Sequence, residues 1–373
     1  MSERVQDYVV DYSVTKLEET ARTFRRLGEA YENASEPQKS GTGISKQLFL
    51  VADVLEECMT MYVHTEDGKK DFVRELTRKC FVNGIRIKNV QHLSKKNGRN
   101  AIVFQARTVG RSCVTAKKVV PVLTEVLRSG YYPGDSNRII NEEYHQYIFI
   151  QEDRFKLLSG VARMNKGKSH FNGDNFLISR LECGKAIAAI ADGMGSGKRA
   201  YIESRMVIEL MENCIDAGFD EKASIDLINS AYIAGGGTGN PVTMDMSVID
   251  CQSGYMHCMK LGAVSTFIRR DKWVEIIQST TLPMGVLEQV DYDCTTKKLY
   301  DGDYIVMVSD GVLDNIPCVN KEERMAQMIH ALTIREPSAM AEKLLEQSLA
   351  YNDMKASDDC TVLVLGLFDT YEK

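Results

Sequence analysis

The chain has 373 residues, of which 44% are hydrophobic and 26% are charged, so we expect a soluble globular protein with two domains. Its net charge of −6 argues against nucleic-acid binding as the main role. No apolar run is as long as a membrane span, and the first residues lack a signal-peptide core. The ten cysteines lack C-x-x-C spacing, which favours reduced thiols over a zinc site. We expect a cytoplasmic protein or the soluble portion of a larger one.

The first 150 residues show helical and strand patterns but no group of residues that would carry chemistry. Apolar residues at helical spacing predict helices over about residues 3–34, 48–62, 70–80 and 114–129. The alternating stretch 85–91 and the apolar stretch 101–106 predict two paired strands, and 131–137 is typical of a loop. The basic residues from Arg86 to Arg99 are expected to form a solvated face. We expect residues 1–150 to form one domain and residues 151–373 another.

Beyond residue 150 the sequence is rich in strands, and its helices come in adjacent pairs. The predicted strands cover about residues 155–163, 175–181, 186–191, 242–249, 255–261, 265–270, 273–278, 292–299, 304–309 and 361–367. The predicted helices cover about residues 199–217, 220–233, 321–332 and 338–347. The first helix is amphipathic, with an apolar face that carries Ile202, Met206, Leu210 and Cys214. This order lacks the regular βαβ alternation of a doubly wound sheet.

One stretch combines a buried strand with a carboxylate and glycines. Six small apolar residues, from Ala186 to Ala191, are typical of a fully buried strand. Asp192 follows at once, and the glycines at positions 193, 195 and 197 let the backbone approach a ligand closely. Alone, this pattern fits a metal-binding carboxylate, a phosphate-binding loop or an ordinary tight turn.

Other aspartates also stand at the ends of apolar strands. They are Asp310 after the strand 304–309, Asp358 and Asp359 before the strand 361–367, and Asp174 before the strand 175–181. Carboxylates gathered at one edge of a sheet repel one another unless a cation neutralises them. Oxygen ligands without a nearby Cys or His set favour Mg²⁺ or Mn²⁺. Two such ions suit phosphate-ester hydrolysis, because they lower the pKa of water and neutralise phosphoryl oxygens.

Several other patterns have simpler interpretations. A single Asp-Gly after a strand is usually a turn, as expected for Asp301 to Asp303, and Asp245 is expected on the polar face of a strand. The stretch from Gly193 to Lys198 is too short for a P-loop and lacks the following Ser or Thr. The pair His257-Cys258 lacks the arginine of a cysteine phosphatase. The glycines from 235 to 239 follow a helix, which favours a flexible loop over a phosphate cradle.

The ordered motifs resemble a known family. The stretches Asp192-Gly-Met-Gly-Ser-Gly, Ser309-Asp-Gly and Ser357-Asp-Asp-Cys-Thr-Val are similar to motifs of the PP2C-type metal-dependent protein phosphatases. Together with Gly173-Asp174 and Leu282-Pro-Met-Gly, they resemble the stage II sporulation branch of that family, over about residues 150–370. The resemblance implies an α+β fold, with an αββα β-sandwich in which helices flank two antiparallel sheets. It also implies that a smaller mixed α/β regulatory domain in residues 1–150 precedes the sandwich.

The resemblance further implies roles for the acidic residues at a centre of two Mn²⁺ or Mg²⁺ ions. Asp192 would bridge the two ions and act in catalysis with Asp310. The Gly193 carbonyl would ligate one ion, and Asp310 and Asp358 would complete the sphere of the other. Asp174 matches the early acidic position of the family.

Two details of this assignment stay open. Asp359 is an alternative to Asp358 as the ligand. Arg163 is only a weak candidate for the phosphate-binding arginine that some relatives place before the first acidic residue. The helices over about residues 199–233 correspond to a regulatory switch in the family.

By the resemblance, the chain is a serine/threonine phosphoprotein phosphatase that needs no phosphoenzyme. Its substrate would be a phosphorylated anti-sigma factor antagonist, and dephosphorylation would activate a sporulation sigma factor. The family suggests a homodimer, a contact with the cell-division machinery, and membrane anchoring of the full-length protein with this portion on the cytoplasmic side. Two other interpretations are an ATP-binding domain of the histidine-kinase type and a catalytically degenerate scaffold or dimerisation module.

Overall fold

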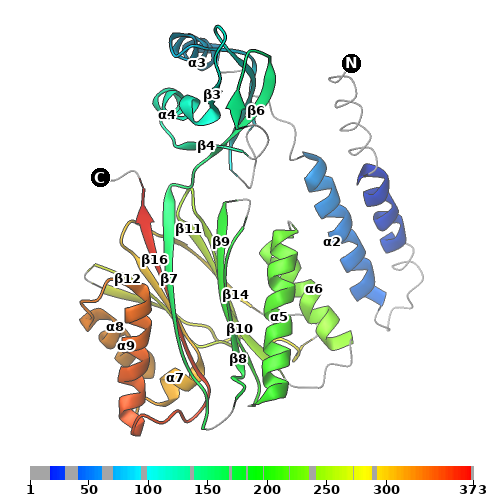
Figure 1. The fold of residues 1–373 in the computed structure, drawn as a ribbon. Coiled ribbons are helices and arrows are strands. Elements are labelled where there is room, and N and C mark those ends of the chain that lie inside the picture. Colours follow the sequence, from blue (N-terminus) through cyan, green and yellow to red (C-terminus); the bar gives the residue numbers. More distant parts are fainter. Residues whose placement is uncertain are drawn as a thin grey trace. The chain divides into compact units, whose positions relative to one another are not determined.

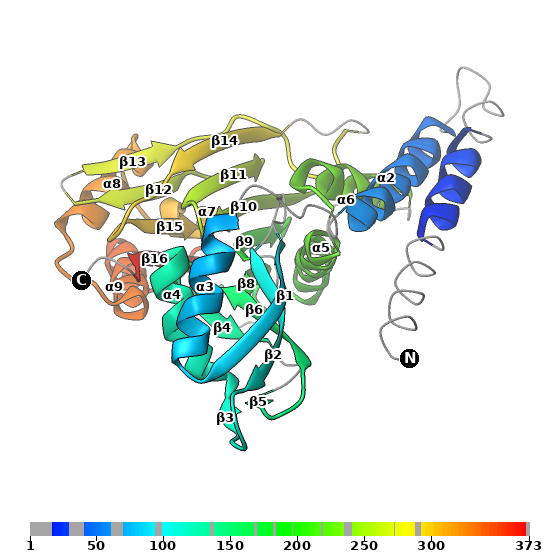
Figure 2. The ribbon, with the colours of Figure 1, turned by 90° about the horizontal axis from the view of Figure 1, so that it is seen from above.

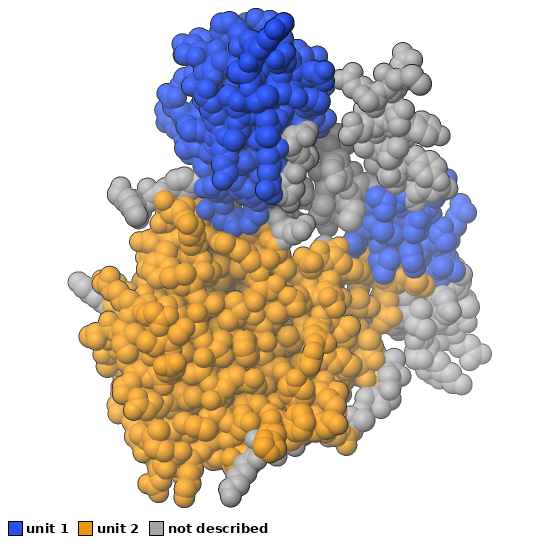
Figure 3. Space-filling model, viewed as in Figure 1, with its two compact units in different colours: residues 1–34, 51–153 blue, residues 35–50, 154–373 orange. Residues whose placement is uncertain are grey.

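The structure, a computed structural model, divides into two compact units (Figure 3). One unit contains residues 1–34 and 51–153, and the other contains residues 35–50 and 154–373. The residues described are 17–29, 41–60, 70–93, 99–134, 138–167, 170–181, 184–195, 197–217, 219–234, 241–271, 273–287 and 292–370. Over these ranges, no helix is both long enough and apolar enough to cross a membrane. All cysteines within them whose side chains are described are free thiols.

The first unit contains a four-stranded antiparallel sheet, with α3 and α4 packed against one face (Figure 2). The strand order is β1-β2-β6-β4. The elements are α3 (Lys70–Val82), β1 (Ile85–Leu93), β2 (Ala101–Thr108), η1 (Ala116–Val119), α4 (Val120–Leu127), β4 (Tyr131–Pro133) and β6 (His145–Gln151), with a separate pair of short strands, β3 (Val114–Thr115) and β5 (Ile139–Ile140). Leu76 of α3 packs on the stacked rings of Phe104 and Phe149, whose centroids are 5.2 Å apart.

Two helices precede this sheet in the sequence. The first covers residues 17–29, and the rest of the long helix predicted over 3–34 lies outside the described residues. The second, α2 (Gly41–Thr60), begins seven residues before the predicted Leu48. Arg25 of the first helix pairs with Glu56 of α2, with 2.8 Å between Nη2 and Oε2.

The prediction of a helix over 114–129 is partly wrong. The structure has β3 and the 3₁₀ turn η1 first, and α4 covers only Val120–Leu127. Pro121 explains the late start, because proline has no N–H and is tolerated only in the first turn of a helix. The helix ends at Arg128, which adopts a left-handed conformation with φ of 54°. The loop predicted over 131–137 contains the short strand β4.

The second unit is a sandwich of two five-stranded antiparallel sheets with helices on both outer faces (Figure 1). The strand orders are β14-β11-β10-β9-β8 and β13-β12-β15-β16-β7. The strands are β7 (Phe155–Met164), β8 (Asp174–Arg180), β9 (Lys185–Gly193), β10 (Val242–Asp250), β11 (Tyr255–Leu261), β12 (Thr266–Arg270), β13 (Trp273–Ile277), β14 (Asp293–Lys298), β15 (Tyr304–Val308) and β16 (Cys360–Asp369). The helices are α5 (Lys198–Asp216), α6 (Glu221–Ala234), α7 (Asp310–Asp314), α8 (Lys321–Ala331), α9 (Pro337–Leu349) and the 3₁₀ turn η2 (Ala350–Asn352). The expected αββα arrangement is confirmed.

Burial on both faces explains why several strands are continuous apolar runs. In β9, Ile187 and Ala189 pack in the core beneath α5 and α6, whereas Ala188 and Ile190 pack between the two sheets. Strand β16 likewise places Val362 and Val364 beneath α8 and α9, with the residues between them in the intersheet core. A strand with no polar face appears in the sequence as an uninterrupted apolar run.

Helix α5 buries a different stripe from the one that the sequence favours. Val207, Met211 and Ile215 pack on the sheet, while Ile202 and Met206 are 52% and 40% exposed. Leu210 is also exposed. Of the predicted apolar face only Cys214 packs against the core, so the helix has two apolar stripes and buries mainly the other one.

Two charged residues are buried between the sheets. Lys260 of β11 and Asp245 of β10 form an ion pair of 2.7 Å, and both side chains are almost wholly buried. Lys260 Nζ also donates to the carbonyl of Val264 at 2.6 Å and to the hydroxyl of Thr266 on the facing sheet at 2.8 Å. The sequence suggested that Asp245 lies on a solvated strand face, but in the structure the residue is buried.

Candidate metal centre

Strand ends from both sheets bring the four predicted acidic positions together. Antiparallel pairing of β8 and β9 places Asp174 directly opposite Asp192. In the other sheet, β15 leads into Asp310, and Asp358 and Asp359 immediately precede β16, which pairs with β15. A hydrogen bond of 2.6 Å from the Gly173 N–H to Asp359 Oδ2 joins the two sets across the sandwich.

Asp174 is a buried carboxylate without hydrogen-bond donors. The residue is 1% exposed, and neither carboxylate oxygen has a hydrogen-bond partner among the described residues. The pKa of Asp174 is raised to about 7, mainly by burial, and the charges of Asp310 and Asp359 contribute to this rise. The hydroxyls of Thr361 and Ser309 are close enough to offset part of this rise, although neither makes a hydrogen bond of ordinary geometry to it.

The pKa values of the neighbouring carboxyl groups of Asp192 and Asp310 are also raised. Burial is the main cause of the raised pKa of Asp192, and the charges of Asp174, Asp310 and Asp358 add to it. Desolvation also raises the pKa of Asp310, although backbone N–H groups at the start of α7 lower it in part. Each carboxylate is therefore costly to ionise while the others are ionised.

This acidic cluster fits a hard cation in its chemistry. Within the described residues, no three side chains of His, Cys, Asp or Glu are close enough to hold a metal ion as they stand. Asp174 nevertheless offers two buried oxygens that accept no hydrogen bond from the described residues. Two further carboxylates lie near it, and their negative charges disfavour its ionised form. A divalent cation is the group that neutralises such a set, and carboxylate oxygens are the ligands that Mg²⁺ and Mn²⁺ prefer.

The two aspartates before β16 have different surroundings. Asp359 is 3% exposed, and its carboxylate accepts hydrogen bonds from the N–H groups of Lys166 at 2.7 Å and Gly173 at 2.6 Å. The Asp358 side chain is 44% exposed, and its Oδ1 lies 3.4 Å from Lys166 Nζ and accepts the Asp359 N–H at 2.9 Å. Both oxygens of Asp359 thus accept N–H groups of the loop before Asp174. The more exposed carboxylate of Asp358 is more available to bind a metal ion.

Two glycines of the Asp-Gly motifs are required by close packing. A Cβ at Gly193 would lie 2.5 Å from the carbonyl oxygen of Ala200 in the first turn of α5. A Cβ at Gly311 would lie 2.2 Å from the carbonyl oxygen of Asp359. Because both contacts are with backbone atoms, a side chain at either position would displace an element of the site.

The loop between β7 and β8 is held by three polar residues, of which the sequence singled out only Arg163. The side chain of Asn172 accepts a hydrogen bond from the Asp174 N–H at 3.0 Å. The buried hydroxyl of Ser204 on α5 donates to the Gly173 carbonyl at 2.6 Å. Arg163 donates to the Asp174 carbonyl, and its guanidinium lies 5.4 Å from the ring of Phe176. These three side chains fix the backbone around Asp174.

Comparison with known proteins places the chain in a family. The family profile described as "Stage II sporulation protein E (SpoIIE)" matches residues 183–368. Stage II sporulation protein E of Bacillus subtilis is 29% identical over 286 residues, which are 76% of this chain and 34% of that protein. The protein of that name from Priestia megaterium is 31% identical over 259 residues, 67% of this chain and 43% of that one. The chain therefore spans well under half the length of these relatives.

Solved structures agree with this relationship. The SpoIIE PP2C phosphatase domain from Bacillus subtilis with a fragment of the regulatory domain matches with a TM-score of 0.64 and 26% identity, covering 88% of this chain and 96% of that one. The SpoIIE phosphatase domain alone matches with a TM-score of 0.50 and 30% identity, covering 60% and 96%. The second unit is thus a phosphatase domain of the PP2C class. Within that class, the chain belongs to the stage II sporulation protein E family.

Proposed function

We propose that this chain is a divalent-metal-dependent phosphatase that hydrolyses phosphoserine or phosphothreonine on a protein. The observation that carries the proposal is the buried, donor-free carboxylate of Asp174 directly opposite Asp192. Membership of the SpoIIE family supports the same activity. Neither an ATP-binding domain of the histidine-kinase type nor a degenerate scaffold accounts for a cluster of buried carboxylates.

In this proposal Asp192, Asp310 and Asp358 hold two Mn²⁺ or Mg²⁺ ions together with the Gly193 carbonyl, and Asp174 contributes directly or through water. Bound ions would lower the pKa of a water molecule and neutralise the phosphoryl oxygens. The chain itself orients the ligands: Asp359 holds the loop before Asp174 in place through two backbone N–H groups. Close packing at Gly193 fixes the start of α5 next to Asp192.

The family also suggests the substrate and the partners. A phosphorylated anti-sigma factor antagonist would be the substrate, and its dephosphorylation would activate a sporulation sigma factor. We assign residues 1–150 a regulatory role, and we place homodimer formation, a contact with the cell-division machinery and membrane anchoring of a longer chain in the same proposal. The shared family with sporulation proteins supports these assignments.

The test is hydrolysis of p-nitrophenyl phosphate and of a phosphoserine peptide by the purified chain, with Mn²⁺, with Mg²⁺ and with EDTA. We expect activity only with a divalent metal, and a loss of about a hundredfold or more in Asp192→Ala and Asp310→Ala. Asp216→Ala, which changes an exposed aspartate at the end of α5, is the matched control and keeps full activity. Metal-independent activity, or activity that survives both site substitutions, would refute the proposal. Hydrolysis of ATP instead would favour the kinase-like interpretation.

A further inference from the structure

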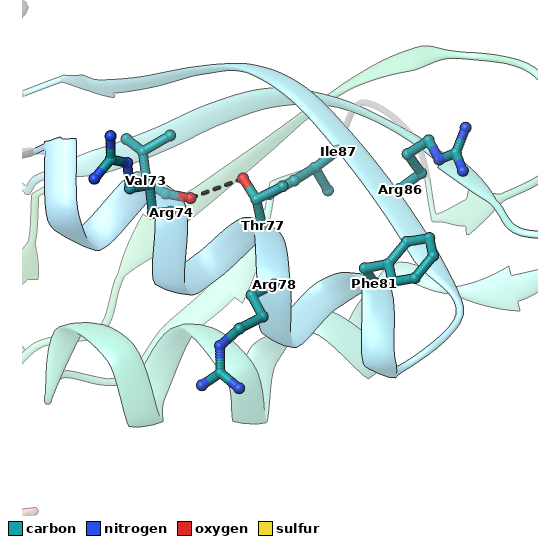
Figure 4. Close-up of a pocket in the computed structure, with 7 residues that line it drawn as sticks. All are labelled: Val73, Arg74, Thr77, Arg78, Phe81, Arg86 and Ile87. Atoms are coloured by element: carbon teal, nitrogen blue, oxygen red, sulfur yellow. Dashed lines mark hydrogen bonds between the residues drawn. The ribbon is translucent and has the colours of Figure 1, made fainter.

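A cleft of about 480 Å³ lies between α3 and β1 in the first unit (Figure 4), a volume within the range of small-ligand sites. Its floor is formed by Val73, Thr77, Phe81 and Ile87. The Thr77 hydroxyl donates to the Val73 carbonyl at 2.7 Å, so its polar atom is already bound within the helix. Phe81 is 51% exposed, and β1 is an edge strand, so no neighbouring strand closes that side. The floor is therefore apolar and open.

Three arginines, Arg74, Arg78 and Arg86, surround this floor. In the part of the chain that the structure describes, none of them has a carboxylate within ion-pair distance, whereas the adjacent Lys79 has two such partners. Arg74 and Arg78 are four residues apart on α3, a spacing at which like charges repel. The Arg86 guanidinium lies 5.6 Å from the Phe81 ring, which keeps it beside the cleft.

A fourth arginine adds to this uncompensated charge. Arg107 of β2 lies directly opposite Arg86 in the β1–β2 pairing, and like charges in this position destabilise a sheet. The Arg107 Nε is buried and has no hydrogen-bond partner among the described residues. Its guanidinium and the ammonium of Lys88 both lie near the Tyr144 ring, at 5.2 and 4.4 Å. Arg107 and Lys88 do not line the cleft, but they add to the positive charge around it.

The surrounding sequence is basic although the whole chain is acidic. Residues 70–153 contain 15 lysines and arginines against 8 aspartates and glutamates, a net charge of +7 in a chain with a net charge of −6. A positive region of this kind attracts and orients acidic partners.

The shape of the cluster restricts the ligand. Figure 4 shows the guanidinium groups of Arg74, Arg78 and Arg86 pointing in different directions around the cleft, so they do not converge on one point as a single phosphate would require. Separated cations on either side of an apolar floor match separated carboxylates on either side of an apolar side chain. We infer that this cleft binds an acidic segment of a partner protein, with an apolar residue of that segment on the floor. Nucleic acid would supply the anions but no aliphatic group for the floor.

The test measures fluorescence anisotropy of a labelled peptide of about twelve residues, built from Asp and Glu around a central Leu and Phe, with the full chain as the titrant. We expect saturable binding. The double variant Arg74→Gln/Arg78→Gln should weaken this binding about tenfold or more, because each substitution removes a charge-assisted contact. Phe81→Ser, at an exposed position, should weaken it to a similar extent. Lys117→Gln/Lys118→Gln removes the same charge from exposed residues outside the cleft and should change affinity less than about twofold.

Several outcomes would overturn this inference. They are the absence of saturable binding, equal weakening by the two double variants, or equal affinity for a peptide with Ser in place of Leu and Phe. Tighter binding of a thymidine oligonucleotide or of phosphatidylglycerol vesicles that also depends on Arg74 and Arg78 would assign the cluster to nucleic acid or to a membrane instead. Circular dichroism confirms that each variant is folded before titration, and phosphatase activity plays no part in the readout.

Discussion

Asp174 and Asp192 lie directly opposite each other on β8 and β9. Burial disfavours the ionised form of each carboxyl group, and each negative charge disfavours ionisation of the other. In the unfolded chain an aspartate titrates near 3.9, whereas in the folded protein the pKa of Asp174 is about 7 and that of Asp192 about 9. The folded state therefore binds more protons than the unfolded state from about pH 4 upwards. The free energy of unfolding of the metal-free protein must therefore fall as the pH rises from about 4 to about 9.

The first prediction follows from this titration. In EDTA, the chain should melt at a lower temperature at pH 8 than at pH 5, and Asp192→Asn should raise its free energy of unfolding at pH 8 by roughly 1–3 kcal/mol. The gain should be much smaller at pH 5, because protonating this carboxyl on folding costs little so close to the pKa of an aspartate in the unfolded chain. Calorimetry at both pH values measures the difference. Asp216→Asn is the control, and an equal gain at both pH values would contradict the prediction.

The second prediction separates Asp358 from Asp359. Asp359→Ala removes the acceptor of two backbone N–H groups and should lower stability by roughly 1–3 kcal/mol. Asp358→Ala removes an exposed ion pair with Lys166 and one hydrogen bond from the neighbouring Asp359 N–H, so stability should change by less than about 1 kcal/mol, while Mn²⁺ affinity should fall. Urea unfolding and titration calorimetry with Mn²⁺ measure the two effects. The opposite pattern would make Asp359 the ligand.

The third prediction concerns Gly193. Its substitution by alanine places a Cβ 2.5 Å from the Ala200 carbonyl oxygen, so the first turn of α5 must move. We expect a loss of roughly 1–3 kcal/mol in stability together with a loss of activity. Gly134→Ala is the matched control, because the nearest atom to its added Cβ lies at an ordinary 3.4 Å. Similar melting curves for the two variants would show that the first turn of α5 adapts freely.

The fourth prediction concerns the buried pair of Asp245 and Lys260. Lys260→Met leaves the Asp245 carboxylate buried without its cation and should cost about 3–5 kcal/mol. The double variant Asp245→Leu/Lys260→Met removes both charges and should be more stable than Lys260→Met alone. Urea unfolding of the single and double variants measures this coupling. Additive losses would show that the two charges do not depend on each other.

The sequence predicts the sandwich well because its strands are buried on both faces. Such strands form short apolar runs with sharp ends, as in Ala186–Ala191, so both the strand and the aspartate after it are visible without an alignment. The stripe of α5 was not predictable in this way. That helix carries two apolar stripes, and the buried one also contains a polar residue, Ser204. The Ser204 hydroxyl donates a hydrogen bond to the Gly173 carbonyl.

The acidic positions of the proposed site follow from sequence patterns, whereas the residues that support them do not. Asp174, Asp192, Asp310 and Asp358 each stand at a strand end, which a sequence pattern records. The different role of Asp359 depends on which loop lies beside it. A hydrogen bond between residues as distant in sequence as Gly173 and Asp359 depends on the pairing of whole strands, and no local pattern encodes it.

The pairing of β7 with β16 also has a consequence for synthesis of the chain. Strand β7 lies at the edge of its sheet and has β16 as its partner there, and Lys166 and Asp359 at their ends are 193 residues apart. At about 5–20 residues per second, roughly 10–40 s pass between the emergence of the two. During that interval β7 has no partner strand, and the loop before Asp174 has no acceptor for its N–H groups. A nascent chain should therefore hydrolyse no phosphate until β16 has left the ribosome.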